Sequence, residues 1–452
     1  MILKYRPRIH KILRIRKQRL VTPDFTSPLP AKIVMSQSQD STATIIEEAA
    51  VVPKGPALCS LDKIGDQYLL THDGVERTFR GLIVATKLDE VRERNIRKWL
   101  SQQQEVLDSQ PLSVNQWLEA VRSRFSQELE YLVLMNLIVG ISYMRERGRH
   151  STEPEDVVSQ NFIWPHIYAA LANTKSLFKP SRSSAGFMFV PLCSLIKDGA
   201  IDELWRLHVW LPDGHRADPA ISVHGHHAFG QSWILAGEGT NHRWAVDAVD
   251  DDHAAEATHA EYRVSWDDGK GSSPGYKTHQ VSSTIVNTYK YFRATRLGSE
   301  ETERRGMTYS VSQDEWHSST VAPEIVFATL FVFDAHRGAN KDAAILGPRD
   351  GESFTTSKDP EGNTADGLVR TVESLRRWED CVAAFSKERL GEAAEDEADE
   401  SKECTATPSS FDQAMRLCKE EPDFPNRDYY VKKTLEARDS VSKIRRGAGA
   451  QT

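Results

Sequence analysis

Residues 222–227 have the sequence Ser222-Val223-His224-Gly225-His226-His227, with three histidines in four positions. In a β-strand successive side chains point to opposite faces, so His224 and His226 share one face and can bind one metal ion together. His227 is expected on the other face, with a hydrogen bond there. The Gln-Ser-Trp-Ile-Leu-Ala-Gly run that follows ends at Gly237 and is typical of a second strand entering a turn.

A third histidine follows a hairpin pattern between Gly306 and His317. Residues 307–311 are strand-like, 312–314 form a polar turn, and the chain re-enters a strand at 315–317. A hairpin of this kind can return a single imidazole across a barrel. The sequence therefore predicts a metal site at His224, His226 and His317.

These two segments resemble the paired motifs of the cupin superfamily, over about residues 204–333. The first cupin motif has a Gly, five residues, His-x-His and a later Gly, and the second has a Gly, five residues, Pro-x-Gly, two residues and His. The first motif is matched at His224, His226 and Gly237, with Asp218 in the place of the opening Gly. The second is matched at Gly306 and His317, while Ser312 and Asp314 replace its Pro and second Gly.

The ligand set departs from many cupins, because the position of their metal-binding glutamate falls near Gly230 or Gln231. Three histidines without a carboxylate resemble the thiol dioxygenases of the cysteine dioxygenase type, which use iron(II), dioxygen and a thiol. The resemblance implies Fe(2+) as the cofactor, and imidazole is also compatible with other divalent metals. Gln231 is a candidate to tune the metal from behind the ligands.

The Ser-x-His-x-Tyr trio of cysteine dioxygenases is absent. Thr329, Phe331 and Phe333 stand at the corresponding positions and are expected to line the pocket. The candidates to bind a substrate carboxylate are Arg206, Arg263 and Arg293. No catalytic acid or base is assigned, and the missing trio argues against cysteine itself as the substrate.

The surrounding pattern predicts an α+β protein: an antiparallel double-sheet cupin jelly-roll barrel with an N-terminal helical layer and C-terminal helices. Short strands are expected at 204–211, 262–266, 276–287, 291–297, 307–311, 315–321 and 326–333, with a turn at 267–269. Residues 68–70, 79 and 82–84 are interpreted as short strands or extended segments.

Helices are predicted on both sides of the barrel. Ser113 and Gln116 have capping-box spacing, and the helix that they begin is expected to run on into the apolar stretch 131–144. Other helical patterns occur around 96–107, 167–171, 368–385 and 411–417.

The chain divides by pattern into five parts. They are a disordered or targeting N-terminal extension at 1–60, a mostly helical region at 61–185 that packs on the barrel, the cupin barrel at 186–350, a helix at 351–388, and an acidic linker with a helical tail at 389–452.

Composition limits location and partners. The net charge of -8 and the pI of about 6.0 give no reason to expect nucleic-acid binding. The apolar run 131–144 is too short for a membrane span, which needs about 20 residues. The five cysteines are scattered without CxxC spacing, which favours a reducing, cytoplasmic location. A mitochondrial location is the alternative, if the basic residues 1–34 form a presequence.

Two functions from different classes are compatible with these features. One is a mononuclear non-haem metal enzyme, an iron-dependent dioxygenase of a small thiol or other small acid. The other is a non-catalytic cupin that binds a metal or ligand as a sensor or interaction module. A small-molecule substrate or ligand is the expected partner. The sequence is also compatible with a homodimer.

Overall fold

The computed structural model describes residues 68–106, 110–150, 154–174, 176–216, 218–265, 276–340, 343–395 and 409–448. The predictions for residues 1–60, for the turn at 267–269 and for most of the acidic run lie outside these ranges.

The described helices flank a block of strands in the chain. The helices are α3 (His72–Ala85), α4 (Glu90–Val106), α5 (Val114–Phe125), α6 (Leu129–His150), α7 (Val157–Asn173), α8 (Ala365–Glu395), α9 (Ser410–Glu420) and α10 (Arg427–Ala448). The strands are β1 (Leu69–Leu70), β2 (Leu112–Ser113), β3 (Ser181–Arg182), β4 (Met188–Lys197), β5 (Ala200–Trp210), β6 (His224–Gly225), β7 (Ala228–Ala236), β8 (Glu238–Val249), β9 (His259–Ser265), β10 (Ser282–Arg304), β11 (Thr308–Val311), β12 (Trp316–Thr320), β13 (Phe327–Ala339), β14 (Ala344–Pro348) and β15 (Phe354–Ser357).

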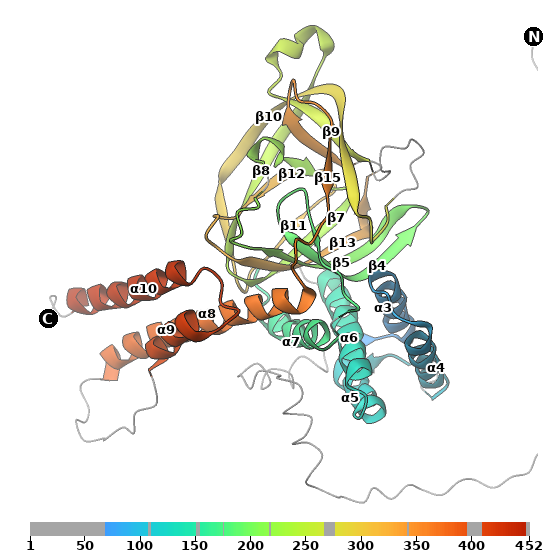
Figure 1. Cartoon of the computed structure of the whole chain (residues 1–452), viewed down its shortest axis with the longest axis vertical. Helices are drawn as coiled ribbons and strands as arrows, with labels where there is room; N and C mark the ends of the chain where they lie inside the picture. The colour runs from blue at the N-terminus through green and yellow to red at the C-terminus, as the bar shows by residue number, and fades with distance from the viewer. Residues whose placement is uncertain are drawn as a thin grey trace, which may run out of the picture. The chain divides into compact units, whose positions relative to one another are not determined.

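The strands form an antiparallel barrel, which confirms the α+β class. One sheet has the order β15-β10-β8-β12-β6-β14-β9, and β10 also pairs with β9, so six of its strands close on themselves (Figure 1). The second large sheet has the order β11-β7-β13-β5-β4-β3. β12 and β6 of the first sheet carry the candidate ligands.

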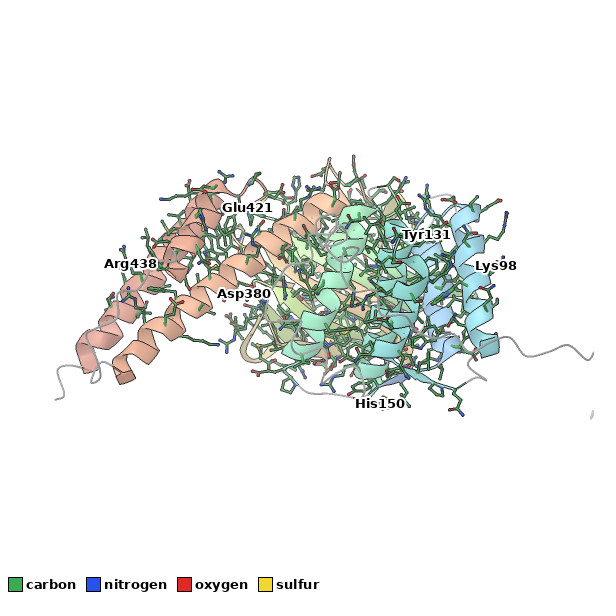
Figure 2. All side chains as sticks on the ribbon, turned by 90° about the horizontal axis from the view of Figure 1, so that it is seen from below. Lys98, Tyr131, His150, Asp380, Glu421 and Arg438 are labelled. Atoms are coloured by element: carbon green, nitrogen blue, oxygen red, sulfur yellow. The ribbon has the colours of Figure 1, made fainter. Side chains whose placement is uncertain are left out.

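The helices cover one face of the second sheet. On β5, Trp205, Leu207 and Val209 pack into one core with helical side chains such as Phe79 and Ile138. The intervening side chains of β5 point to the barrel interior, because strand side chains alternate. Seen from below, the helices lie side by side, from Lys98 on α4 to Arg438 on α10 (Figure 2).

The capping-box prediction is confirmed. The Ser113 side chain accepts from the Gln116 backbone, and the Gln116 side chain accepts from the Ser113 backbone N–H. The continuous helix expected beyond it is wrong. α5 ends at Phe125 and α6 begins at Leu129, with a turn in which the N–H of Glu128 bonds the carbonyl of Phe125.

Two other expectations need correction. Residues 72–85 form α3 rather than extended segments, since Val75, Phe79 and Leu82 recur at helical spacing and Thr71 caps the helix. α8 continues to Glu395, so the start of the acidic run is helical and not a linker. α10 lies within the helical tail expected at 389–452, although no helix was placed at its own residues.

No helix in the described ranges is long and apolar enough to cross a membrane.

Candidate metal centre

Three histidines from two strand segments converge inside the barrel. His224 lies opposite His317 in the β6–β12 pairing, and His226 follows directly after β6. The ring centroids are 4.4 Å apart for His224–His317, 4.7 Å for His226–His317 and 5.3 Å for His224–His226. Each ring offers one nitrogen within 4.8 Å of the other two. The structure therefore brings the three predicted ligands together.

Hydrogen bonds orient two of the three rings. His224 Nδ1 lies 2.9 Å from the carbonyl oxygen of Ser222, and His317 Nδ1 lies 3.0 Å from the side-chain oxygen of Asn241. Both oxygens can only accept, so each ring carries its proton on Nδ1 and leaves the lone pair on Nε2. This is the tautomer that a metal-binding imidazole needs when it coordinates through Nε2.

The separation of His226 and His317 is compatible with one shared ion. Their Nε2 atoms lie 3.0 Å apart. Two nitrogens bound to one ion at about 2.0–2.1 Å are separated by roughly 3 Å when they lie near right angles. Nδ1 of His226 is buried and has no hydrogen-bond partner among the described residues. On its Nδ1 side the His226 ring is thus held by packing rather than by a hydrogen bond.

Burial keeps these imidazoles neutral. It lowers the pKa of His224, although the hydrogen bond to Ser222 acts in the opposite direction. It also lowers the pKa of His226 and of His317 well below the usual value, and the neighbouring histidines add to the shift. Neutral imidazole is the form that binds metal, so no proton has to leave near pH 7.

Aromatic side chains of β13 close the site from the second sheet. The rings of Phe331 and Phe333 stand edge-on to His226, at centroid distances of 5.9 and 5.1 Å. Thr329 lies two residues away on the same strand, is 1% exposed, and has a buried hydroxyl without a partner among the described residues. The two sheets therefore meet at the histidines, and the wall nearest His226 is apolar.

Gln231 does not reach the histidines. Its side-chain oxygen accepts from Arg337 at 2.6 Å, and a Cβ on Gly148 of α6 would lie 3.2 Å from that oxygen. The physical reason is strand alternation, because Gly230 faces His226 and its neighbour must face the helices.

The three arginine candidates differ in surroundings. Arg206 lies opposite Phe331 in the β5–β13 pairing, donates to the Tyr276 hydroxyl at 2.7 Å, and has a buried Nε without a partner in the described ranges. Arg263 pairs with Glu261 at 3.0 Å, and Arg293 pairs with Glu256 at 2.6 Å. Only Arg206 is on the wall that also carries Phe331.

His227 departs from its expected outer-face position. Its ring centroid lies 5.0 Å from that of Phe333, and its Nε2 is buried with no partner among the described residues. Burial lowers the pKa of His227 to about 4, with a further contribution from Arg206. The prediction is wrong because β6 ends at Gly225, so strand alternation does not extend to residue 227.

Two neighbours of the site were missed from the sequence, Asn241 and His208. His208 is 6% exposed and stacks on Phe331, with centroids 4.9 Å apart. The sequence could have predicted this position, because His208 alternates along β5 with Leu207 and Val209, which face the helices. Asn241 gives no such signal, because its contact with His317 depends on the register of β8 and β12.

The neutral state of His208 predicts a loss of stability in acid. Burial lowers the pKa of His208 well below its usual value. Because the pKa of His208 is lower in the folded protein than in the unfolded chain, acid protonates His208 in the unfolded chain first and so favours unfolding. The metal-free protein should therefore lose about 1 kcal/mol through this residue as the pH falls from 7 to 5.5. Urea unfolding should show a weaker pH dependence in His208→Phe, and parallel dependences would contradict the assignment.

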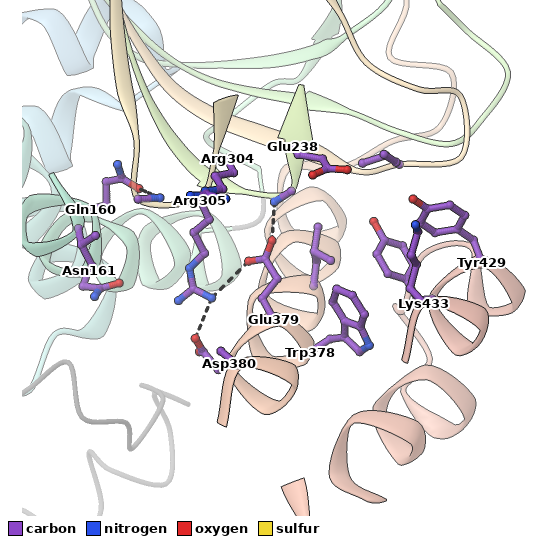
Figure 3. Close-up of a pocket in the computed structure, with 17 residues that line it drawn as sticks. Gln160, Asn161, Glu238, Arg304, Arg305, Trp378, Glu379, Asp380, Tyr429 and Lys433 are labelled. Atoms are coloured by element: carbon purple, nitrogen blue, oxygen red, sulfur yellow. Dashed lines mark hydrogen bonds and ion pairs between the residues drawn. The ribbon is translucent and has the colours of Figure 1, made fainter. Parts of the chain in front are cut away.

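A larger cavity of about 610 Å³ lies between the barrel and helices α7, α8 and α10 (Figure 3). None of the three histidines lines it. Glu379 accepts from the backbone N–H of Gly237 at 2.7 Å and pairs with Arg305 at 3.3 Å, and Arg305 also pairs with Asp380 at 2.8 Å. Because these charges already have partners, the cavity alone indicates no ligand.

A second group of possible metal ligands, His72, Asp73 and Glu76, lies on α3. Nε2 of His72 is 2.8 Å from the carbonyl oxygen of Leu100, and the Asp73 side chain is 90% exposed. Because His72 already has a hydrogen bond to Leu100 and the Asp73 carboxylate is exposed to solvent, this group is not proposed as a metal site.

Comparison with known proteins identifies no family. No protein-family model matches the chain, and no curated protein matches its sequence. Among solved structures, hydroxypropylphosphonic acid epoxidase from S. wedmorenis is similar, with 12% identity, 49% of this chain and 96% of that chain covered, and a TM-score of 0.19. A TM-score this low carries no argument, so function has to be inferred from the site.

Proposed function

We propose that His224, His226 and His317 hold one iron(II) ion and that the protein is a non-haem dioxygenase of a small thiol or other small acid. The observation that carries this proposal is the convergence of three neutral imidazoles, with the Nε2 atoms of His226 and His317 3.0 Å apart. Hydrogen bonds of Nδ1 to Ser222 and to Asn241 leave Nε2 as the ligand atom of His224 and of His317.

Three neutral ligands favour a metal ion that binds an anionic substrate. Bound there, iron would supply redox chemistry and coordination positions that stay open for small ligands. Without a carboxylate ligand the ion keeps its full positive charge, which attracts a thiolate or a carboxylate. Zinc, nickel and copper suit imidazole as well, so the choice of iron rests on the resemblance of the three-histidine set to that of thiol dioxygenases.

The chain's own residues would bind and shield the substrate. Phe331 and Phe333 would exclude water beside His226, and Thr329 would line the same wall. Arg206 is the proposed partner of a substrate carboxylate, since its buried Nε is a donor without an acceptor among the described residues. For a thiol substrate, one dioxygen molecule would deliver both of its oxygen atoms to sulfur and give a sulfinic acid without an external reductant.

The finer description of the fold belongs to the same proposal. We infer that the antiparallel barrel and the facing sheet form a cupin double-sheet jelly roll, with the barrel at 186–350 as the catalytic unit. The interior position of the three histidines supports this inference, because cupin jelly rolls enclose their ligands between sheets.

One observation favours a non-catalytic metal-binding protein instead. Phe331 and Phe333 occupy the wall beside His226, and a phenyl ring can neither donate nor accept a proton. A sensor or a metal-dependent interaction module would not need such a group. This second function differs from the first in one measurable respect, namely substrate-dependent consumption of oxygen.

Oxygen uptake by the iron-loaded protein tests the proposed activity. Cysteine, cysteamine, 3-mercaptopropionate and their oxygen analogues would be supplied in turn. We expect uptake with at least one thiol or small acid, with an equal amount of product, and no uptake in a variant that has alanine at all three histidines. Iron binding without uptake for any compound would overturn the enzyme and favour the non-catalytic alternative.

A further inference from the structure

Glu303 is a buried carboxyl group that the proposed chemistry does not use. It lies near the end of β10, is 5% exposed, and its Oε2 is buried without a hydrogen-bond partner in the described ranges. Leaving a buried carboxyl group unpaired is costly unless water or a ligand satisfies it. The position therefore calls for a partner that is not a protein atom.

A small cavity beside Glu303 can supply that partner. Its volume is about 10 Å³, and it is lined by Glu303, Asn241, Tyr309 and Ser319, among others. That is close to the space that one water molecule needs. Glu303 faces Gly239 in the β10–β8 pairing, and a Cβ on Gly239 would meet Phe327, so Glu303 points to the barrel interior.

The same cavity touches the residue that holds His317. The side-chain oxygen of Asn241 lies 3.0 Å from His317 Nδ1 and accepts from it. The Asn241 amide nitrogen is then a donor, and it has no hydrogen bond to any described residue. A donor from Asn241 and an acceptor from Glu303 border one water-sized space.

We propose that Glu303 is a positioning residue for the metal ligand His317, acting through one water and the side chain of Asn241. The Asn241 amide nitrogen donates to the water, and the water donates to the Glu303 carboxylate. The Asn241 oxygen, polarised by this chain, accepts a stronger hydrogen bond from His317 Nδ1 and makes Nε2 a better metal ligand. The inference rests on the proposed metal site.

The surrounding charges make this link dependent on pH. Burial raises the pKa of Glu303 to about 7; Glu301 on the same strand raises it further, and Arg243 on β8 lowers it. Tyr309 on β11 lines the same cavity as this carboxyl group, and burial raises the pKa of its hydroxyl. Glu303 should thus ionise close to neutral pH and strengthen the hold on His317 above it.

Affinity for Co²⁺ measured by chelator competition at pH 6 and pH 8 tests the role of Glu303. We expect Glu303→Ala to weaken binding by about 10–100-fold at pH 8. Glu303→Gln, which can still accept from the water but cannot ionise, should lose less and should show a flatter change between the two pH values. Glu300→Gln removes the same charge from a residue of the same strand that is 64% exposed and paired with Arg296, and it should bind like the wild type.

A second readout needs no metal. In the metal-free protein, the NMR signal of the His317 Nδ1 proton should move upfield in both Glu303 variants, because its hydrogen bond weakens. Variants with wild-type affinity at both pH values and an unmoved proton signal would overturn the role of Glu303 and leave the metal site standing. A wild-type protein that binds no Co²⁺ would overturn the metal site and this inference with it.

Discussion

Replacing Arg145 with alanine is expected to lower the free energy of unfolding by about 3–5 kcal/mol, because it breaks a buried ion pair. Arg145 on α6 and Glu203 on β5 are 2% and 1% exposed, and Nε of Arg145 lies 2.7 Å from Oε1 of Glu203. The same guanidinium donates to the Gly74 carbonyl and to the Thr78 hydroxyl on α3. One side chain thus ties two helices to the sheet that backs the candidate site.

The carboxylate partner makes this effect dependent on pH. Burial alone would raise the pKa of Glu203, but Arg145, Trp205 and Arg77 outweigh it and hold the pKa below its usual value. The pair therefore stabilises the fold above the ordinary carboxyl pKa of about 4.3, and the contribution is lost as the pH falls towards the folded-state pKa. The difference between wild type and Arg145→Ala should shrink in acid.

Urea unfolding at pH 7 measures the effect of Arg145→Ala. Arg149→Ala on the same helix is the matched control, since Arg149 is 34% exposed and its nearest carboxylates are 3.6 and 3.7 Å away. Such a pair contributes about 0–1 kcal/mol. Equal losses in the two variants would contradict the assigned role of the Arg145–Glu203 pair.

A methyl group added at Gly230 should weaken metal binding by about 10–100-fold. A Cβ on Gly230 would lie 2.8 Å from Nδ1 of His226 and 3.1 Å from Cζ of Phe331. The His226 ring has no hydrogen bond at Nδ1 to a described residue, so only packing holds that side of the ring and the ring must move. The Gly230 backbone is not in the left-handed region, so alanine there adds no conformational strain.

Gly225→Ala is the matched control for Gly230→Ala. Gly225 lies between His224 and His226, yet a Cβ there would have its nearest neighbour 3.8 Å away, at the Glu315 carbonyl oxygen. We expect this variant to keep the wild-type affinity for Co²⁺. If both variants bind equally, then contact with Gly230 does not set the position of His226.

Local patterns were sufficient for part of the fold. The Ser113–Gln116 box and the 3.6-residue spacing of apolar residues gave several helices, because capping and amphipathicity are properties of adjacent residues. α3 was missed because Phe79 and Leu82 to Val84 also suit a strand in a short window. The break between α5 and α6 was missed because apolar residues continue at similar spacing on both sides.

In the candidate site, too, some features could be predicted from local sequence and others could not. His224 and His226 were found from a local two-residue spacing, and His317 was found from the spacing of the second motif, while its contact with His224 depends on the pairing of β6 and β12. The contacts of Asn241 with His317 and of Gly230 with His226 depend on which strands pair and in what register. Gln231 was placed wrongly for this reason, since its motif position does not reveal which face of β7 meets the ligands.

The metal content of the purified protein shows whether His224, His226 and His317 bind an ion. The wild-type chain and a variant with His224, His226 and His317 all changed to alanine would be reconstituted with Fe²⁺ under anaerobic conditions, desalted and analysed for metals. The three converging imidazoles predict about one metal ion per wild-type chain and none in the variant. No metal in the wild-type protein, or equal metal in both, would contradict the account.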